Sequence, residues 1–223
     1  MRLSEWYHVY DEILRDLNID RSSDESSARM LKMLTLNSDL ISDEELHPLI
    51  SKEVIVVGGN VSDNDTELIK ALRPGRTLIS AGSATDVLIV NGIIPDITVT
   101  DLDGDVGLQK KASLSGSVML IHAHGDNTGL IAEHVRDLRG KMMITTQSVP
   151  DHVLYNFGGF TDGDRAVCMA RHFGAKKMIL VGFEFDTPSR KPDTDTEMKK
   201  RKLRWAKKII FDMNPDDVTI TML

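Results

Sequence analysis

The feature that most constrains the fold is a run of four apolar β-branched residues ending in two glycines, Val54-Ile55-Val56-Val57-Gly58-Gly59. A continuous apolar run of this kind is typical of a strand covered on both faces in a parallel sheet. Further strands are expected at 77–82, 97–100, 118–122, 141–146, 177–182 and 218–222, with helical patterns between several of them. Strands that alternate with helices predict an α/β fold, with a mainly parallel sheet flanked by helices.

The first 50 residues differ from the rest because their apolar side chains follow helical spacing. One predicted helix face consists of Trp6, Val9, Tyr10, Ile13, Leu14 and Leu17. Two capping boxes are expected, from Ser22 to Glu25 and from Ser42 to Glu45. These patterns predict an N-terminal helical cap over residues 1–50, followed by an α/β domain over residues 51–223.

Within the second region, further helices are expected at 86–90, 164–173 and 203–213. The segment 186–198 contains two prolines and many Asp and Thr residues, which predicts a flexible loop. A lid is one role for such a loop.

Composition narrows the classes of function. The 223 residues carry a formal net charge of −7, whereas nucleic-acid binders usually carry a basic stripe. The basic run within 199–208 lies on a predicted helix, where a solvated face is favoured over attraction for an anionic ligand. No apolar segment approaches the ~20 residues that cross a bilayer, and the N-terminus lacks a signal-peptide core. We expect a cytoplasmic protein with no nucleic-acid or membrane partner, and the oligomeric state, a homodimer included, stays open.

Cys168 is the single cysteine of the chain, so an intramolecular disulfide framework and a cysteine metal cluster are excluded. It lies in an apolar helical stretch, Ala166-Val167-Cys168-Met169-Ala170. A packed thiol is therefore expected there rather than a nucleophile.

The candidate site begins with three carboxylates at alternate positions after the predicted strand 97–100, in Asp101-Leu102-Asp103-Gly104-Asp105. Alternate residues of an extended segment share a face, so Asp101 and Asp103 are expected to converge, and Asp105 can join them. Mg²⁺ is usually held by one or two carboxylates plus substrate phosphates, and ligands of open α/β sheets bind at the carboxyl ends of strands. A metal–phosphate site and a solvated acidic turn are balanced interpretations of these five residues alone.

Two further polar loops favour a metal–phosphate site over a solvated acidic turn. They are Ile121-His122-Ala123-His124-Gly125-Asp126-Asn127 and Gly158-Gly159-Phe160-Thr161-Asp162-Gly163-Asp164-Arg165, and each follows the region of an apolar run. Three glycine-containing loops at strand ends predict one composite site. A zinc site at His122, His124 and Asp126 is less favoured than hydrogen bonding within an active-site loop, because the neighbouring carboxylates suit a harder ion. Arg165 is either an ion-pair residue or a guanidinium that stabilises a transferring phosphate.

The loop Gly58-Gly59-Asn60 invites a dinucleotide-binding interpretation, but the G-x-G-x-x-G pattern is absent. The chain also lacks a Walker A sequence, which disfavours a P-loop kinase. Backbone N–H groups of this loop can still meet an anion at a helix N-terminus, and its role stays open.

Taken together, these motifs resemble the archaeal 6-hydroxymethyl-7,8-dihydropterin pyrophosphokinase family over most of the chain, the helical N-terminus included. The resemblance rests on the two loops above and on the segments 80–88 and 92–105, Ser80-Ala81-Gly82-Ser83-Ala84-Thr85-Asp86-Val87-Leu88 and Gly92-Ile93-Ile94-Pro95-Asp96-Ile97-Thr98-Val99-Thr100-Asp101-Leu102-Asp103-Gly104-Asp105. The family is in turn similar to the catalytic domains of thiamine pyrophosphokinases.

The resemblance implies a Mg²⁺-dependent diphosphokinase of pterin or folate-type cofactor biosynthesis. The hydroxymethyl oxygen of a reduced pterin, 6-hydroxymethyl-7,8-dihydropterin, would attack the β-phosphorus of a nucleoside triphosphate, and AMP would leave. The donor is ATP, and GTP stays open as an alternative. It implies Mg²⁺ ligands at Asp101, Asp103 and Asp126, which with Arg165 form the catalytic set. The substrate- and nucleotide-binding residues that it implies are Gly82, Ser83, Asp86, His122, His124, Asn127, Thr161, Asp162 and Asp164.

The chain departs from the thiamine enzymes in the later loop, with Phe160 in place of Arg and Gly163 in place of His. These departures disfavour thiamine as substrate and leave Arg165 as the nearby cation. A second departure is Gly58-Gly59-Asn60-Val61-Ser62, where family members usually carry Gly-x-Gly-Pro-Ser.

Three rival functions are considered beside the pterin enzyme. The first is a thiamine pyrophosphokinase-like enzyme. The second is a haloacid-dehalogenase-type phosphatase, which is disfavoured because two βα units precede the Asp-x-Asp strand. The third is a noncatalytic nucleotide- or sugar-phosphate-binding module, which would not need the retained carboxylates.

Overall fold

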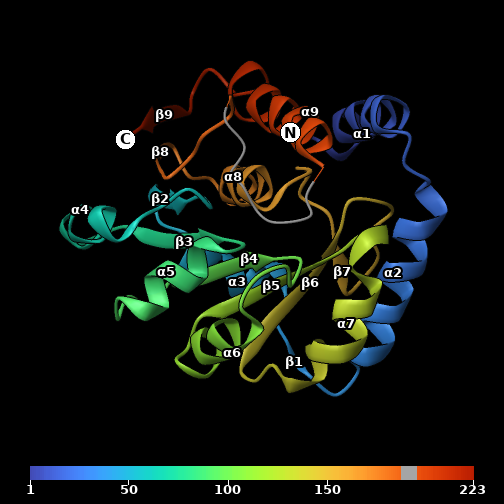
Figure 1. Ribbon diagram of the computed structural model, residues 1–223, viewed down its shortest axis with the longest axis horizontal. Helices are drawn as coiled ribbons and strands as arrows, with labels where there is room; N and C mark the ends of the chain where they lie inside the picture. The colour runs from blue at the N-terminus through green and yellow to red at the C-terminus, as the bar shows by residue number, and fades with distance from the viewer. Residues whose placement is uncertain (187–194) are drawn as a thin grey trace.

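The computed structural model describes residues 1–186 and 195–223, which form one nine-stranded sheet with helices on both faces (Figure 1). The strand order is β1-β6-β5-β4-β3-β2-β8-β9, β7 pairs with β6, and every one of these pairs is parallel. The strands are β1 (Asp39–Leu40), β2 (Glu53–Val57), β3 (Thr77–Ala81), β4 (Ile97–Thr100), β5 (Val118–Ala123), β6 (Lys141–Thr146), β7 (Leu154–Tyr155), β8 (Lys177–Val181) and β9 (Thr219–Met222).

The helices are α1 (Leu3–Leu17), α2 (Arg21–Leu34), α3 (Asp43–Leu46), α4 (Thr66–Leu72), α5 (Ala84–Val90), α6 (Val106–Leu114), α7 (Thr128–His134), α8 (Asp162–His172) and α9 (Thr196–Lys207). Short helical turns are η1 (His47–Leu49), η2 (Asp63–Asp65), η3 (Gly125–Asn127), η4 (Val135–Asp137) and η5 (Lys208–Asp212). The predicted α/β fold with a mainly parallel sheet is therefore confirmed, and the predicted strands form.

The two faces of the sheet are covered by different helices because alternate side chains of each strand point to opposite faces. Val54 and Val56 pack with α8 and with Ala206 of α9, whereas Ile55 and Val57 pack with α4 and α5. The continuous apolar run in β2 thus has a partner layer on each side, as expected of a buried parallel strand.

The order of the strands reverses direction at β2. From β2 the chain adds β3, β4, β5 and β6 toward one edge of the sheet, whereas β8 returns to the other side of β2. In open α/β sheets, ligands bind outside the carboxyl ends of the strands near such a reversal. The loops that follow β2, β3, β4, β5, β6 and β8 therefore open toward the expected ligand position.

Residues 1–50 are mostly helical and also contribute β1, which pairs with β6 at the sheet edge. Helix α1 packs its apolar face against Phe160 and Cys168, and α2 packs beside α7 (Figure 1). The capping box from Ser42 to Glu45 is confirmed, but the one predicted at Ser22 is wrong. The N-cap of α2 is Asp20 instead. Its carboxylate accepts the Ser22 N–H, so the helix begins at Arg21 and Ser22 lies inside it.

Helix α9 begins earlier than the sequence pattern predicts. The Asp195 carboxylate accepts the N–H groups of Glu197 and Met198, so the helix starts at Thr196 rather than at 203. The prediction of a loop over 186–198 is therefore wrong for 196–198. The lid suggested for this segment falls largely on 187–194, which lie outside the described residues.

Two expectations from composition have structural counterparts. Cys168 is buried, and burial raises the pKa of its thiol to about 12, in keeping with a packed thiol. In the part of the chain that the structure describes, each helix is too short or too polar to span a bilayer.

Candidate functional site

A cavity of about 390 Å³ lies at the carboxyl ends of the central strands. Its wall includes the segments 58–60 after β2, 81–83 at the end of β3, 124–126 after β5 and 182–185 after β8, together with Asp101, Asp103 and Gln147. The segment 160–163 and Arg165, at the start of α8, and one face of α9 complete it. The three polar loops that the sequence assigned to one composite site do meet in this cavity.

The turn after β4 presents two carboxylates to the cavity. Asp101 and Asp103 both line it, and Asp101 Oδ1 accepts the Asp103 N–H at 3.0 Å. Leu102 between them has a left-handed backbone with φ of 69°, which is rare for a bulky residue. Its side chain is fully buried among Met119, Ile121 and neighbours, so burial of the leucine offsets the backbone cost.

His124 and Asn127 join the loop after β5 to this turn. His124 Nε2 lies 3.1 Å from Asp101 Oδ2, and both side chains are largely buried. Asn127 Nδ2 donates to the main-chain oxygens of Asp101 at 2.9 Å and of His122 at 2.6 Å. The Asn127 side chain is therefore a brace between two loops, and it does not line the cavity.

His122 is buried behind this loop and is not in the cavity wall. Its Nδ1 lies 3.0 Å from Thr145 Oγ1 of β6. Burial, then the charges of Arg165 and His124, hold the pKa of His122 well below its ordinary value. His122 is thus a neutral side chain beneath the site, whereas His124 lies in the wall.

The loop before α8 depends on a close approach between Gly159 and Arg165. Gly159 has φ of 93°, and a Cβ there would come within 2.5 Å of Arg165 Cα, so a side chain is excluded. Asp164 is fully buried and accepts the N–H groups of Phe160 at 2.6 Å and Thr161 at 2.8 Å. Asp164, in the first turn of α8, therefore fixes the preceding loop through its main-chain N–H groups, and it does not line the cavity.

Asp162 and Arg165 form the most buried ion pair at the site. Arg165 Nη1 lies 3.1 Å from Asp162 Oδ1, and the two side chains are 7% and 13% exposed, Arg165 first. Arg165 Nη2 donates to Gln147 Oε1 at 3.1 Å. Asp162 also lies against the end of β3, since a Cβ on Gly82 would meet its Oδ2 at 2.8 Å. One guanidinium is thus held by two partners at the cavity wall.

The two carboxylates Asp101 and Asp162 are near enough to influence each other. Burial raises the pKa of Asp162 well above its ordinary value, and the charge of Asp101 raises it further. Burial also opposes the charge on Asp101, but its hydrogen bond to His124 and the charges of His124 and Arg165 prevail and lower the pKa of Asp101. Negative charge on both carboxylates at once is therefore disfavoured, and an added cation would relieve their repulsion.

Nine of the predicted site residues line the cavity, and four do not. Those in the wall are Gly82, Ser83, Asp101, Asp103, His124, Asp126, Thr161, Asp162 and Arg165. The four outside are His122, Asn127 and Asp164, described above, and Asp86. Asp86 Oδ2 accepts the Asp105 N–H at 3.2 Å and so supports the turn after β4. Asp105 itself caps α6 by accepting the Leu108 N–H, rather than converging with Asp101.

The described residues contain no cluster of three His, Cys, Asp or Glu side chains arranged to hold a metal ion. Asp126 in particular is 81% exposed and has Lys202 Nζ 3.9 Å from its Oδ2. Beside the His124 imidazole, the cavity wall offers the carboxylates of Asp101, Asp103 and Asp162. Such hard oxygen donors fit Mg²⁺ bound through one or two carboxylates and substrate phosphates, and do not fit a three-ligand zinc site.

Asp24 and Gln147 belong to the site but were not predicted from the sequence. Asp24 accepts the Gly125 N–H and the Gln147 Nε2–H, both at 2.7 Å, and it also accepts the Tyr10 hydroxyl. Gln147 in turn holds Arg165. The buried position of Asp24 on α2 carries no local signal except that an acidic residue lies on the apolar side of a helix.

Comparison with known proteins identifies the family. Residues 29–190 match the family model described as 6-hydroxymethylpterin diphosphokinase MptE-like. The chain is 35% identical to the 6-hydroxymethyl-7,8-dihydropterin pyrophosphokinase of Methanothermobacter thermautotrophicus, with 94% of each chain covered. It is 36% identical to the protein of that name from Pyrococcus furiosus, covering 94% of this chain and 93% of the relative. For the one from Methanocaldococcus jannaschii the identity is 34%, with 94% and 95% covered.

A solved structure shares the fold at low sequence identity. The MAf glycosyltransferase from Magnetospirillum magneticum AMB-1 matches with a TM-score of 0.55 and 19% identity. The match covers 78% of this chain and 34% of the glycosyltransferase, so this chain spans about a third of that protein's length. The likeness concerns the fold alone.

The family model and the relatives at 34–36% identity confirm the resemblance inferred from the motifs, and the chain belongs to the 6-hydroxymethylpterin diphosphokinase MptE-like family.

Proposed function

We propose that this protein transfers diphosphate from ATP to the hydroxymethyl oxygen of 6-hydroxymethyl-7,8-dihydropterin and releases AMP. The names of its relatives support this activity. The observation that carries the proposal is the meeting of Asp101, Asp103 and Asp162 with the Arg165 guanidinium in one cavity at the strand ends. Phosphoryl transfer depends mainly on positioning and charge neutralisation, and this site has groups for both.

Mg²⁺ is the cofactor that this donor set fits. Asp101 and Asp103 would hold it from one turn, with substrate phosphates as the other ligands, and Asp162 of the same cavity wall would orient the substrate. When bound, Mg²⁺ would offset the negative charge of the phosphates. Asp126 is the weaker ligand candidate, because Lys202 already lies beside it.

The protein's own groups have distinct parts in the reaction. The hydroxymethyl oxygen forms a bond to the β-phosphorus, the bond from that phosphorus to the bridging oxygen on the α-phosphorus breaks, and AMP leaves with that oxygen. Arg165, fixed by Asp162 and Gln147, would stabilise the charge on the transferring group. His124 is the imidazole of the cavity wall; its Nε2 faces Asp101 and its Nδ1 accepts the Asp126 N–H, so it would hold Asp101 in place, and the hydroxyl proton would pass to water.

The rival substrate thiamine is disfavoured by two positions, one just before α8 and one in its first turn. Phe160 lies in the wall where the thiamine enzymes have Arg, and Gly163 faces Phe183 where they have His. An added Cβ on Gly163 would come within 2.8 Å of Phe183, so this position has no room for a histidine unless the ring moves. The wall here is apolar and aromatic, which suits a flat neutral ring such as a pterin.

The test is to incubate the protein with the pterin, ATP and Mg²⁺, and to measure AMP and pterin diphosphate by chromatography. Thiamine as acceptor and GTP as donor are run beside them. The proposal predicts equal amounts of AMP and pterin diphosphate, with kcat/KM for thiamine at least about 100-fold lower, since a mismatched ring leaves polar groups unpaired. Comparable rates with thiamine, or ATP cleavage without pterin diphosphate, would contradict it.

A further inference from the structure

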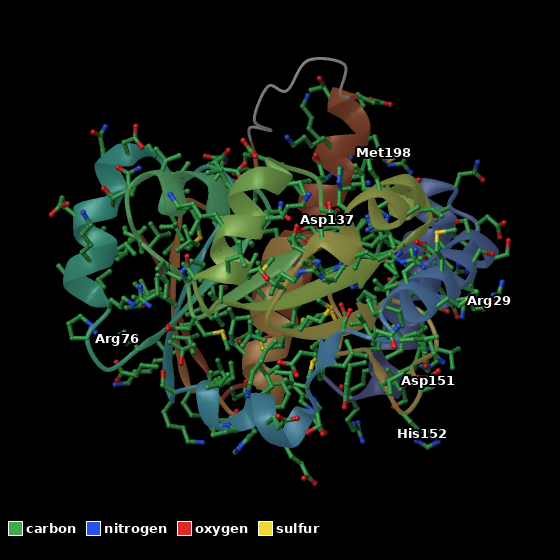
Figure 2. The ribbon with its side chains drawn as sticks, turned by 90° about the horizontal axis from the view of Figure 1, so that it is seen from below. Arg29, Arg76, Asp137, Asp151, His152 and Met198 are labelled. Carbon is green, nitrogen blue, oxygen red and sulfur yellow. The ribbon has the colours of Figure 1, made fainter. Side chains whose placement is uncertain are left out.

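Helix α9 turns one face to the cavity. Its cavity-lining residues recur every three or four positions, which is the spacing of one helix face: Met198, Lys199, Lys202, Leu203 and Ala206, preceded by the capping Asp195. Met198, labelled in Figure 2, marks the first turns of this helix. Two of the five helical positions are lysines, although they face a wall that is otherwise rich in carboxylates.

The other basic residues of the segment 199–208 have different partners. Arg201 Nη2 and Trp205 Nε1 both bond to Asp16 of α1, at 3.0 Å and 2.8 Å. Lys208 Nζ lies 3.3 Å from Glu12 of the same helix, and α1 and α9 lie side by side in Figure 1. These contacts hold α9 against α1, while Lys199 and Lys202 of α9 line the cavity.

Lys202 lies where it can change partners at little cost. Its Nζ is 3.9 Å from Asp126 Oδ2 and 5.9 Å from the centre of the Phe160 ring. The Asp126 carboxylate is 81% exposed, and exposed ion pairs contribute little to stability. A ligand with a denser negative charge would therefore displace Asp126 from Lys202 readily.

We propose that Lys202, with Lys199 one turn away, forms a phosphate subsite on α9 for the polyphosphate chain of the donor nucleotide. Asp126 holds Lys202 over the Phe160 ring until the phosphates arrive, and is a partner of Lys202 rather than part of the reacting centre. The inference rests on the proposed function in naming the donor, and it assigns the α9 side of the cavity to phosphate binding.

A polyphosphate is the occupant that fits these groups. The cavity volume of about 390 Å³ is in the range of small-ligand sites. Its wall holds Asp24, Asp101, Asp103, Asp162 and Glu184, which repel a nucleotide triphosphate unless cations intervene. Lys202 and Lys199 supply such charge from α9, while Arg165 supplies it from α8, so the phosphates would lie between two helices.

The test is nucleotide binding, which does not require turnover. The affinity of wild type and Lys202→Ala is measured by calorimetry for the Mg²⁺ complex of α,β-methylene ATP, and for AMP. Loss of a charge-assisted contact should weaken binding of the triphosphate analogue by about tenfold or more. AMP, which lacks the β- and γ-phosphates, should bind both proteins within about twofold, and Lys202→Arg should recover most of the affinity.

The matched control is Lys200→Ala. Lys200 lies on the same helix, pairs with Glu197 at 2.9 Å and does not line the cavity, so its loss should leave both affinities unchanged. Equal weakening in the two variants, or an unchanged affinity in Lys202→Ala, would overturn the subsite. Lys202-dependent binding without pterin diphosphate formation would retain the subsite and reject the proposed function. Pterin diphosphate formation by the wild type, together with unchanged binding in Lys202→Ala, would retain the proposed function and reject the subsite.

Discussion

The side chain of Asn127 is hydrogen-bonded to the main chain of Asp101, with 2.9 Å between Asn127 Nδ2 and the Asp101 oxygen. The same amide also accepts the His124 N–H at 3.0 Å. One buried side chain therefore ties the loop after β5 to the turn after β4, and it fixes the two elements that carry His124 and Asp101. The arrangement explains why these residues, 23 positions apart, form a pair.

Replacing Asn127 with Ala should destabilise the protein and impair the site together. The substitution leaves buried carbonyl groups of Asp101 and His122 without their donor, which costs about 1–3 kcal/mol. Urea unfolding measures the loss, and pterin diphosphate formation should fall in the same variant. Asn37→Ala, at an exposed position, is the control and should change stability by less than about 0.5 kcal/mol. Equal stabilities of the two variants would refute the role given to Asn127.

The left-handed backbone at Leu102 predicts an inverted order of two variants. Leu102→Ala and Leu102→Gly both remove the buried side chain, which should cost about 2–5 kcal/mol. Glycine ordinarily costs more than alanine, but at φ of 69° it relieves backbone strain. Urea denaturation should therefore find Leu102→Gly at least as stable as Leu102→Ala. A glycine variant less stable by about 1 kcal/mol would show that the backbone here is unstrained.

The sequence pattern was sufficient for the sheet and for the convergence of its loops. The apolar run in β2 and the position of Asp101 and Asp103 after β4 follow from local periodicity and from the common direction of parallel strands. The role of Asp164 could not be predicted, because a carboxylate in the first turn of a helix has the same sequence pattern whether it binds a ligand or accepts N–H groups of the preceding loop.

Contacts between residues far apart in the chain could likewise not be predicted from the sequence. Asp24 meets Gln147 across 123 positions, and Lys202 reaches Asp126 from a helix whose start was predicted too late. Such pairs depend on how α2 and α9 pack on the sheet, which no local pattern specifies.

The division into a cap over 1–50 and a domain over 51–223, and the identity of the metal, stay predictions.

The burial of His122 predicts a pH-dependent stability. Burial, with the charges of Arg165 and His124, lowers the pKa of His122 in the folded chain, whereas an unfolded histidine titrates near its ordinary value. As the pH falls through about 6.5, the unfolded chain takes up a proton that the folded chain does not, so stability decreases. The slope attributable to this residue should approach about 1.4 kcal/mol per pH unit between pH 6.5 and the lowered pKa.

The measurement is urea unfolding from pH 5 to 8 for wild type and His122→Gln. The difference between the two curves should change with pH below about 6.5 and be constant above it. His152→Gln, which replaces an exposed histidine (Figure 2), should give a curve parallel to wild type. Parallel curves for wild type and His122→Gln would show that His122 is not the group responsible.

Arg165 should act on the reaction and not merely on the fold. Arg165→Lys keeps a charge near Asp162 but loses the planar fork that also reaches Gln147. Its kcat should fall at least about tenfold, and that of Arg165→Ala about 100-fold or more. Arg171→Lys is the control. Arg171 is buried against the main-chain oxygens of Ile209 and Ile210 and does not line the cavity, so its replacement should leave kcat unchanged. A change in thermal stability with kcat intact in Arg165→Lys would reduce Arg165 to a structural ion pair.

The most direct test of the central claim, that the carboxylates after β4 form the reaction centre, is the kcat for pterin diphosphate formation in three variants. Asp101→Asn and Asp103→Asn remove charges in the cavity wall, whereas Asp105→Asn removes the neighbouring charge that caps α6 outside it. We predict that kcat falls by about 100-fold or more in the first two variants, with the proteins still folded by circular dichroism, and by less than about threefold in the third. Wild-type kcat in both Asp101→Asn and Asp103→Asn, or an equal fall in all three variants, would contradict the account.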